Sequence, residues 1–399
     1  MKNNILNFHF YSTLCSKKTH DVLFKQHNVN TGNAAQIFFG LIAEGLKDNF
    51  GTKVYVNSVL PINHTEQKKI FWKLSSEIEN NIDYNYIPLI NLPILMNFLN
   101  SFYIFFQILF KRYSSKTKDI IIVDFLRFSI NLPIVLAAKL RGIKTLVIVT
   151  DRPGEGIYNE TLKSKIRDLF IFTLSYDFYV CVTTELNSAV NKKNRPSLII
   201  EGFANVKFKE LVNEVTGKYN ERVIVYAGGL NKRYGIEMLI EGFKMIQDTR
   251  LRLWLFGFGS YIDEIKKYSE TDVRVEYRGV IPNEELIHIL TKATLLVNPR
   301  PSNENYTKYS FPSKNLEYMS VGTPLVTTKL PGIPKDHYPH IYFIEDETET
   351  GIYNTLKTIL EKSDEELNQF GSLCKAFILN EKNNIIQSRK ILELIYHNS

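Results

Sequence analysis

Residues 298–326 read NPRPSNENYTKYSFPSKNLEYMSVGTPLV, a stretch with the order strand end, polar loop, helix and strand. Ser310 and Pro312 predict the helix start, because proline lacks the N–H that a first helical turn leaves unpaired. Such a start exposes backbone N–H groups that can bind a phosphate. Three basic residues add positive charge around it: Arg300, Lys308 and Lys314.

Glu317 lies further along the same predicted helix, between Leu316 and Tyr318. A carboxylate in this place can accept hydrogen bonds from both vicinal hydroxyls of a ribose, and such charge-assisted bonds are strong. A helical glutamate is more often only a solvated side chain. Here the strand, the loop, the proline-capped helix and a following Gly-x-Pro occur together, so we interpret the stretch as a nucleotide-binding site.

Short runs rich in β-branched and aromatic residues alternate with helical patterns along the whole chain, which is typical of βαβ units and parallel sheets. In the first half the expected strands are residues 5–10, 54–57, 119–123, 144–149 and 177–182, and the clearest helix is 33–49. In the second half the expected strands are 222–226, 251–256, 273–277, 294–298 and 324–327, and the helices are 236–246, 260–268, 283–292 and 312–320. The sequence therefore predicts an α/β protein with two tandem doubly wound, Rossmann-like domains, whose ligands bind at the carboxyl ends of the strands.

The length of 399 residues exceeds what one hydrophobic core usually supports. The alternation of elements breaks around residues 195–219, which are rich in proline, glycine and charge. We therefore expect an N-terminal domain over 1–203, a C-terminal domain over 204–380, and a final helix over 381–399 that can pack back on the first domain. The default place for a site is the cleft between two such domains.

The net charge of +7 comes from 49 basic and 42 acidic residues spread over the chain. This balance suits anionic partners such as phosphates or an acidic membrane surface, but it lacks the dense basic stripe of a nucleic-acid-binding protein. The three cysteines show no metal-binding spacing and are expected to be reduced, buried thiols. Polar residues interrupt the first apolar stretch, so we expect a cytoplasmic protein without a signal peptide.

The segment from Leu89 to Phe110 carries no charge and approaches the length of a membrane span. Its polar residues recur every three to four positions, which places them on one narrow stripe of a helix. They are Asn97, Asn100, Ser101, Gln107 and Lys111, and further basic residues follow at 112, 116 and 118. Three interpretations stay open. The segment is a helix that rests on anionic lipid, a mostly buried helix of the domain, or, least favoured, a true membrane span.

From Val223 to Thr328 the sequence resembles the retaining glycosyltransferases of family 4, which have the two-domain GT-B fold with a central cleft. In that family a Glu-x7-Glu motif precedes a Gly-x-Pro, and its second glutamate holds the ribose of the donor. Glu317 matches this second glutamate, whereas Tyr309 stands in place of the first. The resemblance implies that backbone amides near Ser310, Phe311 and Pro312 can serve the transferred sugar.

The loop from Tyr226 to Gly235 is similar to the family's first C-terminal-domain loop, where an arginine and a lysine usually neutralise the donor diphosphate. Gly229 and Tyr234 occupy those two places. We assign the diphosphate to the intervening Lys232 and Arg233, and a basic surface turn is the alternative. Two later strand ends of this sequence also resemble strand ends of the family. The resemblance at the second of them implies that its backbone contacts the nucleobase. Its residues are Gly279 and Val280, and an ordinary tight turn is the alternative.

Residues 31–36 match the position of the family's acceptor loop, which makes Asn33 and Gln36 the candidates for acceptor binding; Asn33 is alternatively only a helix N-cap. Asp151 ends a strand where many family members carry a histidine in the cleft. It is our first candidate for a catalytic polar group, with a turn-forming aspartate as the alternative. Asp124, at another strand end, is the second candidate.

The resemblance implies an enzyme that moves a sugar from a UDP- or GDP-type donor to a glycan or a polyprenyl-diphosphate-linked saccharide, with retention of configuration. We expect it in capsule or lipopolysaccharide assembly, in the cytoplasm or peripherally on the inner face of the cell membrane. No Asp-x-Asp motif occurs, so we expect no metal and no other cofactor. Two alternatives are a non-catalytic nucleotide-sugar-binding subunit, suggested by Gly229, Tyr234 and Tyr309, and a sugar-nucleotide epimerase.

Overall fold

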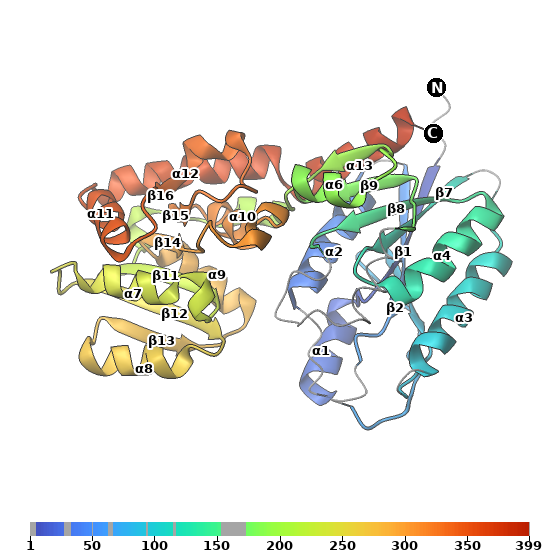
Figure 1. The fold of residues 1–399 in the computed structure, drawn as a ribbon, viewed down its shortest axis with the longest axis horizontal. Coiled ribbons are helices and arrows are strands. Elements are labelled where there is room, and N and C mark those ends of the chain that lie inside the picture. Colours follow the sequence, from blue (N-terminus) through green and yellow to red (C-terminus); the bar gives the residue numbers. More distant parts are fainter. Residues whose placement is uncertain are drawn as a thin grey trace. The chain divides into compact units, whose positions relative to one another are not determined.

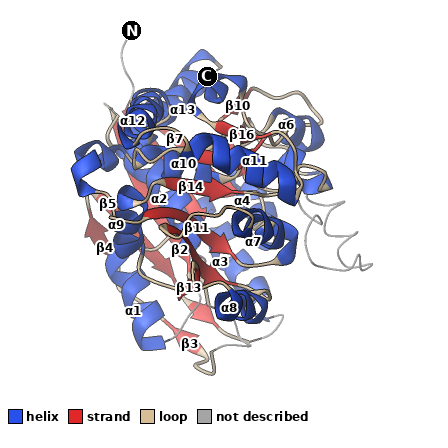
Figure 2. Ribbon diagram, turned by 90° about the vertical axis from the view of Figure 1, so that its left-hand side faces the viewer, coloured by secondary structure: helices blue, strands red, loops and turns tan. Residues whose placement is uncertain are grey.

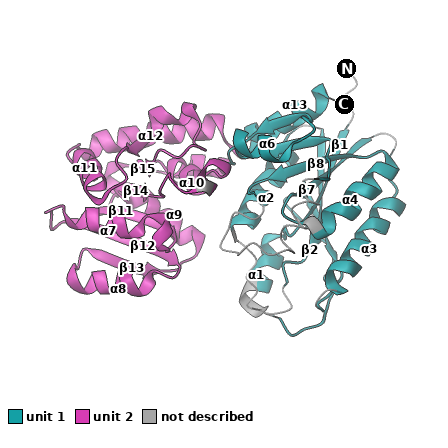
Figure 3. Cartoon of the chain, viewed as in Figure 1, with its two compact units in different colours: residues 1–203, 384–399 teal, residues 204–383 magenta. Residues whose placement is uncertain are grey.

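The computed structural model describes residues 5–27, 33–49, 51–62, 67–92, 95–114, 117–152 and 173–398 (Figure 1). The chain divides into two compact units, each with its own parallel sheet (Figure 3). Unit 1 comprises Met1–Phe203 with Asn384–Ser399, and unit 2 comprises Ala204–Asn383. Strands flanked by helices, the α/β arrangement that the alternating sequence pattern predicts, are visible in Figure 2.

Unit 1 contains an eight-stranded sheet that is parallel except for one edge strand. Its strands, in spatial order, are β10 (Ser197–Ile199), β9 (Phe178–Cys181), β8 (Lys144–Val149), β7 (Thr117–Asp124), β1 (Ile5–Ser12), β2 (Thr52–Val59), β5 (Ile82–Ile87) and the antiparallel β4 (Glu77–Glu79). A small antiparallel pair is formed by β3 (Phe71–Trp72) and β6 (Leu89–Ile90). The helices are α1 (Lys17–His27), α2 (Asn33–Lys47), α3 (Leu95–Phe110), α4 (Phe128–Arg141), α6 (Thr184–Val190) and α13 (Asn384–His397).

The last helix, α13, completes the core of unit 1. Because side chains alternate along a strand, the even-numbered residues of β1 share one face, and there they join the apolar side of α13 in a single core. The backbones of α13 and α2 approach so closely that a Cβ at Gly45 would lie 2.1 Å from the carbonyl oxygen of Asn384. Only glycine permits this contact, which fixes the end of the chain against the first unit.

Unit 2 contains a six-stranded, wholly parallel sheet. Its strands, in spatial order, are β13 (Val275–Gly279), β12 (Leu251–Phe258), β11 (Arg222–Gly229), β14 (Leu295–Asn298), β15 (Leu325–Thr328) and β16 (Tyr342–Ile344). The helices are α7 (Ile236–Lys244), α8 (Ile262–Thr271), α9 (Asn283–Lys292), α10 (Ser313–Ser320), α11 (Glu349–Leu360) and α12 (Asp364–Glu381). Short 3-10 turns cover Val206–Glu210, Val215–Gly217, Lys232–Tyr234, Asn305–Tyr309 and Lys335–His340.

Every helix and strand expected from the sequence is present within a few residues of its expected ends. The exception is the apolar segment 89–110, of which only a part is helical. Leu89 and Ile90 are not helical, because they pair with Phe71 and Trp72 in the small β3–β6 sheet. The helix of this segment therefore begins only at Leu95 and has 16 residues. Among the ranges that the structure describes, no helix has the length and apolar character needed to cross a membrane.

Candidate functional site

The loops that leave the carboxyl edge of the unit 2 sheet are held together by glycine. Gly257, at the end of β12, has a φ of +126°, and a Cβ there would lie 1.8 Å from the carbonyl oxygen of Gly228 in β11. Gly235 has a φ of +80°, and its Cβ would lie 2.1 Å from the carbonyl oxygen of Pro299, just after β14. Any other residue would be strained and would clash at both places, so these glycines bring three strand ends to one location.

Helix α10 starts at this same edge. Its first helical residue is Ser313, and Pro312 is the N-cap with a φ of −73° and a ψ of +90°. The expected helix start at Ser310 and Pro312 is therefore wrong by one to three residues, because a ψ of +90° lies outside the helical range and Ser310 is extended as well. No described side chain caps the helix, so backbone N–H groups of its first turn are available to a ligand.

Tyr318 anchors α10 to the end of β11. Its buried hydroxyl accepts a hydrogen bond from the backbone N–H of Ala227 at 2.8 Å and donates one to the carbonyl oxygen of the same residue at 3.1 Å. Asn298, the last residue of β14, donates from Nδ2 to Oδ1 of Asn315 at 2.8 Å. Helix α10 is thus fixed to two neighbouring strand ends.

Replacing Tyr318 by phenylalanine should destabilise unit 2 by about 2 kcal/mol, because the buried backbone N–H and carbonyl of Ala227 then lose their partner. Urea denaturation of the full chain measures this difference. The matched control is Tyr396→Phe, whose side chain is exposed and whose loss of a hydroxyl should have no measurable effect. Equal stability of the two variants would contradict the anchoring role of Tyr318.

Glu317 is half-buried on α10, and its Oε1 is inaccessible to solvent with no hydrogen-bond partner among the described residues. Burial raises the pKa of this carboxyl, and the nearby Lys314 partly opposes the rise. Burial lowers the pKa of Lys314, whose stem lies so near β11 that a Cβ at Gly228 would be 3.0 Å from its Cε. A carboxylate and an ammonium are therefore held together at the edge where α10 meets β11.

Several buried polar atoms between residues 300 and 317 have no partner among the described residues. Besides Glu317 Oε1 they are Ser310 Oγ, Arg300 Nε, Tyr306 Oη and Asn315 Nδ2, each of which lacks a hydrogen bond within the described part of the chain. Each such atom costs about 1–3 kcal/mol of stability, so folded proteins rarely leave several at one place. Five such atoms within residues 300–317 make this stretch the candidate ligand site.

Two guanidinium groups stack on the same two tyrosine rings. Arg300 lies 5.2 Å from the ring centroid of Tyr234 and 5.7 Å from that of Tyr306. Arg233 lies 4.9 Å and 5.9 Å from these centroids, and its Nη2 donates to Tyr234 Oη at 2.9 Å. A Cβ at Gly229 would lie 2.8 Å from the Tyr234 ring, so glycine is needed there. The cluster places two cations beside the start of the loop that leads to α10.

Three other predicted donor-site residues lie apart from this cluster. Lys232 is exposed and forms an ion pair with Glu237, with 2.8 Å between Nζ and Oε2, so its charge is already matched. Gly279 ends β13, which is two strands away from β11 in the sheet, and the side chain of the next residue, Val280, is exposed. Phe311 and Pro312 are buried in the segment that leads into α10.

In unit 1 the two predicted catalytic aspartates lie at neighbouring strand ends. Asp124 is the last residue of β7, and Asp151 follows β8, the adjacent strand. Burial raises the pKa of Asp124, Arg127 opposes the rise and the charge of Asp151 adds to it. Arg127 lies 3.8 Å from Asp124 Oδ2 and also donates to Thr13 Oγ1 at 3.4 Å. The carboxyl edge of this sheet therefore carries two carboxylates and an arginine.

Gln36, a predicted acceptor-binding residue, has a structural contact in unit 1. Its Oε1 accepts from the backbone N–H of Cys15 at 2.9 Å, and its Nε2 donates to the carbonyl oxygen of Thr13 at 2.6 Å. The side chain thus holds the loop that follows β1. Asn33 begins α2, and its side chain and the preceding residues 28–32 lie outside the described part.

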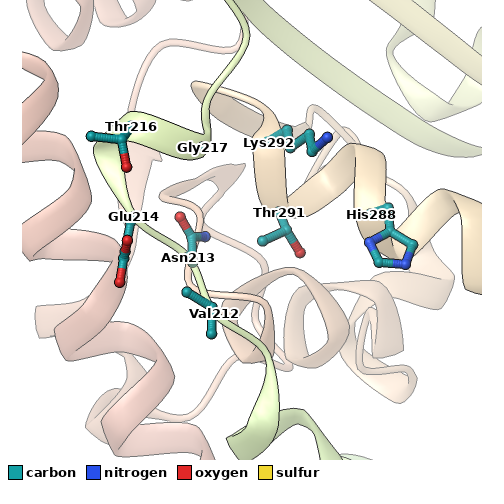
Figure 4. Close-up of a pocket in the computed structure, with 8 residues that line it drawn as sticks. All are labelled: Val212, Asn213, Glu214, Thr216, Gly217, His288, Thr291 and Lys292. Atoms are coloured by element: carbon teal, nitrogen blue, oxygen red, sulfur yellow. The ribbon is translucent and has the colours of Figure 1, made fainter.

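A pocket of about 200 Å³ lies elsewhere on unit 2, between the end of α9 and the loop before β11 (Figure 4). Its lining includes Glu214, His288 and Lys292, and none of the predicted site residues. Lys292 precedes β14, so the pocket is at the amino edge of the sheet, beside the end of α10, where Asn213 donates to the carbonyl oxygen of Val321 at 2.8 Å. In the described ranges no group of three or more His, Cys, Asp and Glu side chains could hold a metal ion.

Sequence reasoning from the motif identified Glu317, Lys314 and Arg300, which the structure brings to one edge. It missed Tyr306 and the two-tyrosine stack, because contacts between residues 233, 234, 300 and 306 depend on two loops that meet only in the folded sheet. It also missed Arg127 in unit 1, although a basic residue three positions after a strand-terminal aspartate was a readable signal.

Comparisons with known proteins agree with this architecture. Residues 221–362 match the family described as "Glycosyl transferases group 1". The solved structure of HepE from Anabaena in complex with UDP is 12% identical, with a TM-score of 0.64 over 98% of this chain and 99% of that one. Sucrose-phosphate synthase from Thermosynechococcus elongatus is 15% identical, with a TM-score of 0.68 over 98% and 100%. The lipopolysaccharide outer core galactosyltransferase WaaB is 12% identical, with a TM-score of 0.60 over 98% and 100%.

No curated protein sequence matches the chain. At these identities the structural likeness establishes the fold and nothing further. The chain therefore has the two-domain GT-B fold, and the part that matches the glycosyl transferases group 1 family contains β11, α10 and the whole cluster around Glu317.

Proposed function

We propose that this protein is a glycosyltransferase that binds a nucleotide-sugar donor at the carboxyl edge of the unit 2 sheet. The observation that carries the proposal is the set of buried, unpartnered polar atoms at Glu317, Ser310, Arg300 and Tyr306. Ser310 precedes the uncapped start of α10 and Glu317 lies within this helix, and all four residues fall in the region that matches the glycosyl transferases group 1 family. Anion-binding amides, two guanidinium groups and a carboxylate are the groups that a diphosphate and a ribose require.

Each group has a role in this proposal. Glu317 accepts hydrogen bonds from the ribose hydroxyls, and its unpartnered Oε1 supplies the acceptor. Arg300, Arg233 and Lys314 with the first amides of α10 neutralise the diphosphate, which leaves as the sugar is transferred. The expected cations at Gly229 and Tyr234 are absent from those positions, and the guanidinium groups that stack on Tyr234 replace them. Lys232 has a lesser role, because Glu237 holds its charge.

The transfer breaks the bond between the anomeric carbon and the diphosphate oxygen and forms a bond from that carbon to an acceptor oxygen. The acceptor hydroxyl loses its proton, which a leaving phosphate oxygen or a carboxylate takes up. In our proposal Asp151 and Asp124 of unit 1 are the carboxylates nearest the acceptor, and Arg127 orients Asp124. The finer features that we propose are retention of configuration, independence from metal, and a glycan or lipid-linked acceptor of a cell-surface polysaccharide.

The nucleotide is of the UDP or GDP type. HepE was solved with UDP and with UDP-glucose, and TarM from S. aureus with UDP, so uridine donors are the first to test. A donor at about 100 times its dissociation constant stabilises a protein by about 2.7 kcal/mol. Thermal unfolding against UDP-glucose, UDP-galactose, UDP-N-acetylglucosamine and GDP-mannose should therefore show a rise of several degrees with one of them.

Turnover separates this function from its alternatives. With the selected donor labelled in its sugar and saccharide acceptors added, we expect label to move to an acceptor at an unchanged rate in EDTA. Donor binding without transfer would identify a non-catalytic subunit, and conversion of the sugar nucleotide without an acceptor would identify an epimerase. Failure of every nucleotide sugar to raise the unfolding temperature would contradict the proposal.

A further inference from the structure

Helix α3 buries a side of mixed polar and apolar residues and turns a strongly apolar side outward. Its buried residues are Asn100, Ile104 and Ile108. Gln107 accepts a hydrogen bond from Tyr11 of β1, and Ser101 donates to the carbonyl oxygen of Ser129 in α4. The inner side of α3 thus combines Asn100, Ser101 and Gln107 with two buried isoleucines, whereas Asn97 is exposed and the outer side carries the largest apolar side chains.

The outward side of α3 is a ridge of four phenylalanines spaced four residues apart. Phe98, Phe102 and Phe110 are 65%, 57% and 72% exposed, and Phe106 lies between them. Consecutive ring centroids along the ridge are 6.5, 4.6 and 5.7 Å apart. Single exposed apolar residues are common in soluble proteins, but a continuous aromatic ridge marks a surface that binds something apolar.

Helix α4 extends this apolar surface. It packs beside α3 in unit 1 (Figure 1), and three leucines spaced four residues apart lie on its exposed side. They are Leu132, Leu136 and Leu140. We define the α3–α4 face as these three leucines and the four phenylalanines of the ridge.

The exposed charges on α3, on α4 and on the residues next to them are positive. Basic side chains that are exposed lie at the ends of the two helices and at the start of the next strand: Arg112, Lys118, Lys139 and Arg141. Over residues 84–150 the sequence contains only two acidic residues, Asp119 and Asp124. Asp124 is buried, and Asp119 is half-buried and held by His9 at 2.7 Å. Asp83, just before this range, lies near Lys111 at the end of α3. An apolar surface whose adjacent exposed charges on α3, α4 and the start of β7 are basic fits a bilayer with anionic head groups.

We propose that the α3–α4 face docks on an anionic phospholipid bilayer. The helices lie on the membrane and do not cross it, since neither is long and apolar enough to span. A second copy of the chain fits this face less well, because an isologous contact brings two basic borders together. Docking would hold the enzyme beside a lipid-linked acceptor, and in this respect the inference rests on the proposed function.

Flotation of the full chain with vesicles tests the proposal. Wild type should float with phosphatidylcholine vesicles that contain about 30 mol% phosphatidylglycerol, stay unbound with pure phosphatidylcholine, and dissociate in high salt. Phe98→Ser with Phe102→Ser should abolish binding, whereas the control Phe71→Ser removes an exposed phenylalanine outside the face and should not. Arg112→Gln with Lys139→Gln should weaken binding about 25-fold, since each charge contributes about fivefold.

Lys193→Gln with Arg195→Gln, which removes two exposed charges elsewhere in unit 1, should bind as wild type does. Wild type that stays unbound with both vesicles would overturn the proposal, as would a dimer that the Phe98 and Phe102 changes dissociate. Thermal shift by the nucleotide sugar is measured on the same variants. A variant that no longer floats but keeps its thermal shift has lost only membrane binding by the α3–α4 face. Absence of a thermal shift in wild type would count against the proposed function and not against membrane binding.

Discussion

Glu317→Gln should lower the rate of transfer from a nucleotide sugar at least about 100-fold, because each charge-assisted hydrogen bond to a ribose hydroxyl contributes about 1.5–3 kcal/mol. The amide has nearly the volume of the carboxylate, so the fold should not change. The measurement is kcat/KM for the donor selected by thermal shift. Glu285→Gln, at an exposed position on α9, is the matched control and should retain wild-type activity.

The stability of the same variant separates a functional role of Glu317 from a structural one. Burial raises the pKa of Glu317 above its ordinary value of 4.5, so the folded protein holds this proton more tightly than the unfolded chain. Wild type therefore loses stability as the pH rises above that value, and Glu317→Gln does not. The variant should be more stable than wild type, by more at about pH 7.5 than at about pH 5. Loss of stability together with activity would contradict a ligand-binding role.

Arg300→Gln should raise KM for the nucleotide sugar about 30-fold, with a smaller fall in kcat, because a cation that meets the diphosphate contributes mainly to donor binding. The arginine Nε is buried without a partner among the described residues, so its removal leaves no protein group unpaired. Steady-state kinetics with varied donor gives both constants. Arg300→Lys should restore only part of the affinity, because lysine lacks the planar donor geometry of arginine.

Arg250→Gln is the control for this variant. Arg250 is exposed at the amino edge of the same sheet, where it pairs with Asp248. The Arg250→Gln change should leave KM for the nucleotide sugar unchanged. An equal rise in KM for both variants would show a general effect of net charge and would contradict a specific contact between Arg300 and the diphosphate.

The α/β architecture of both units follows directly from the sequence, because buried parallel strands such as β7 and β11 are continuous apolar runs. Strand β5 reads IDYNYI, and its polar residues interrupt the apolar run, so the strand was not predicted. The site was predictable where one local motif carries it, as at Glu317 and Lys314. The stack of Arg300 and Arg233 on Tyr234 and Tyr306 was not, because it forms between separate loops.

The orientation of α3 was also beyond the sequence. The periodicity gives one polar stripe and one apolar face, and an ordinary helix would bury the apolar face. Here part of the stripe lies on the inner side of α3 together with Ile104 and Ile108, and Gln107 accepts a hydrogen bond from Tyr11 of β1. The pattern of a single helix does not include the groups on neighbouring elements that its residues contact, such as Tyr11 of β1 and Ser129 of α4.

The most direct measurement is a calorimetric titration of wild type and Glu317→Gln with the nucleoside diphosphate of the selected donor and with its 2′,3′-dideoxy analogue. Loss of the two hydroxyls should weaken binding to wild type at least about tenfold and binding to the variant hardly at all. An equal loss of affinity in both proteins would mean that the carboxylate of Glu317 does not hold the ribose.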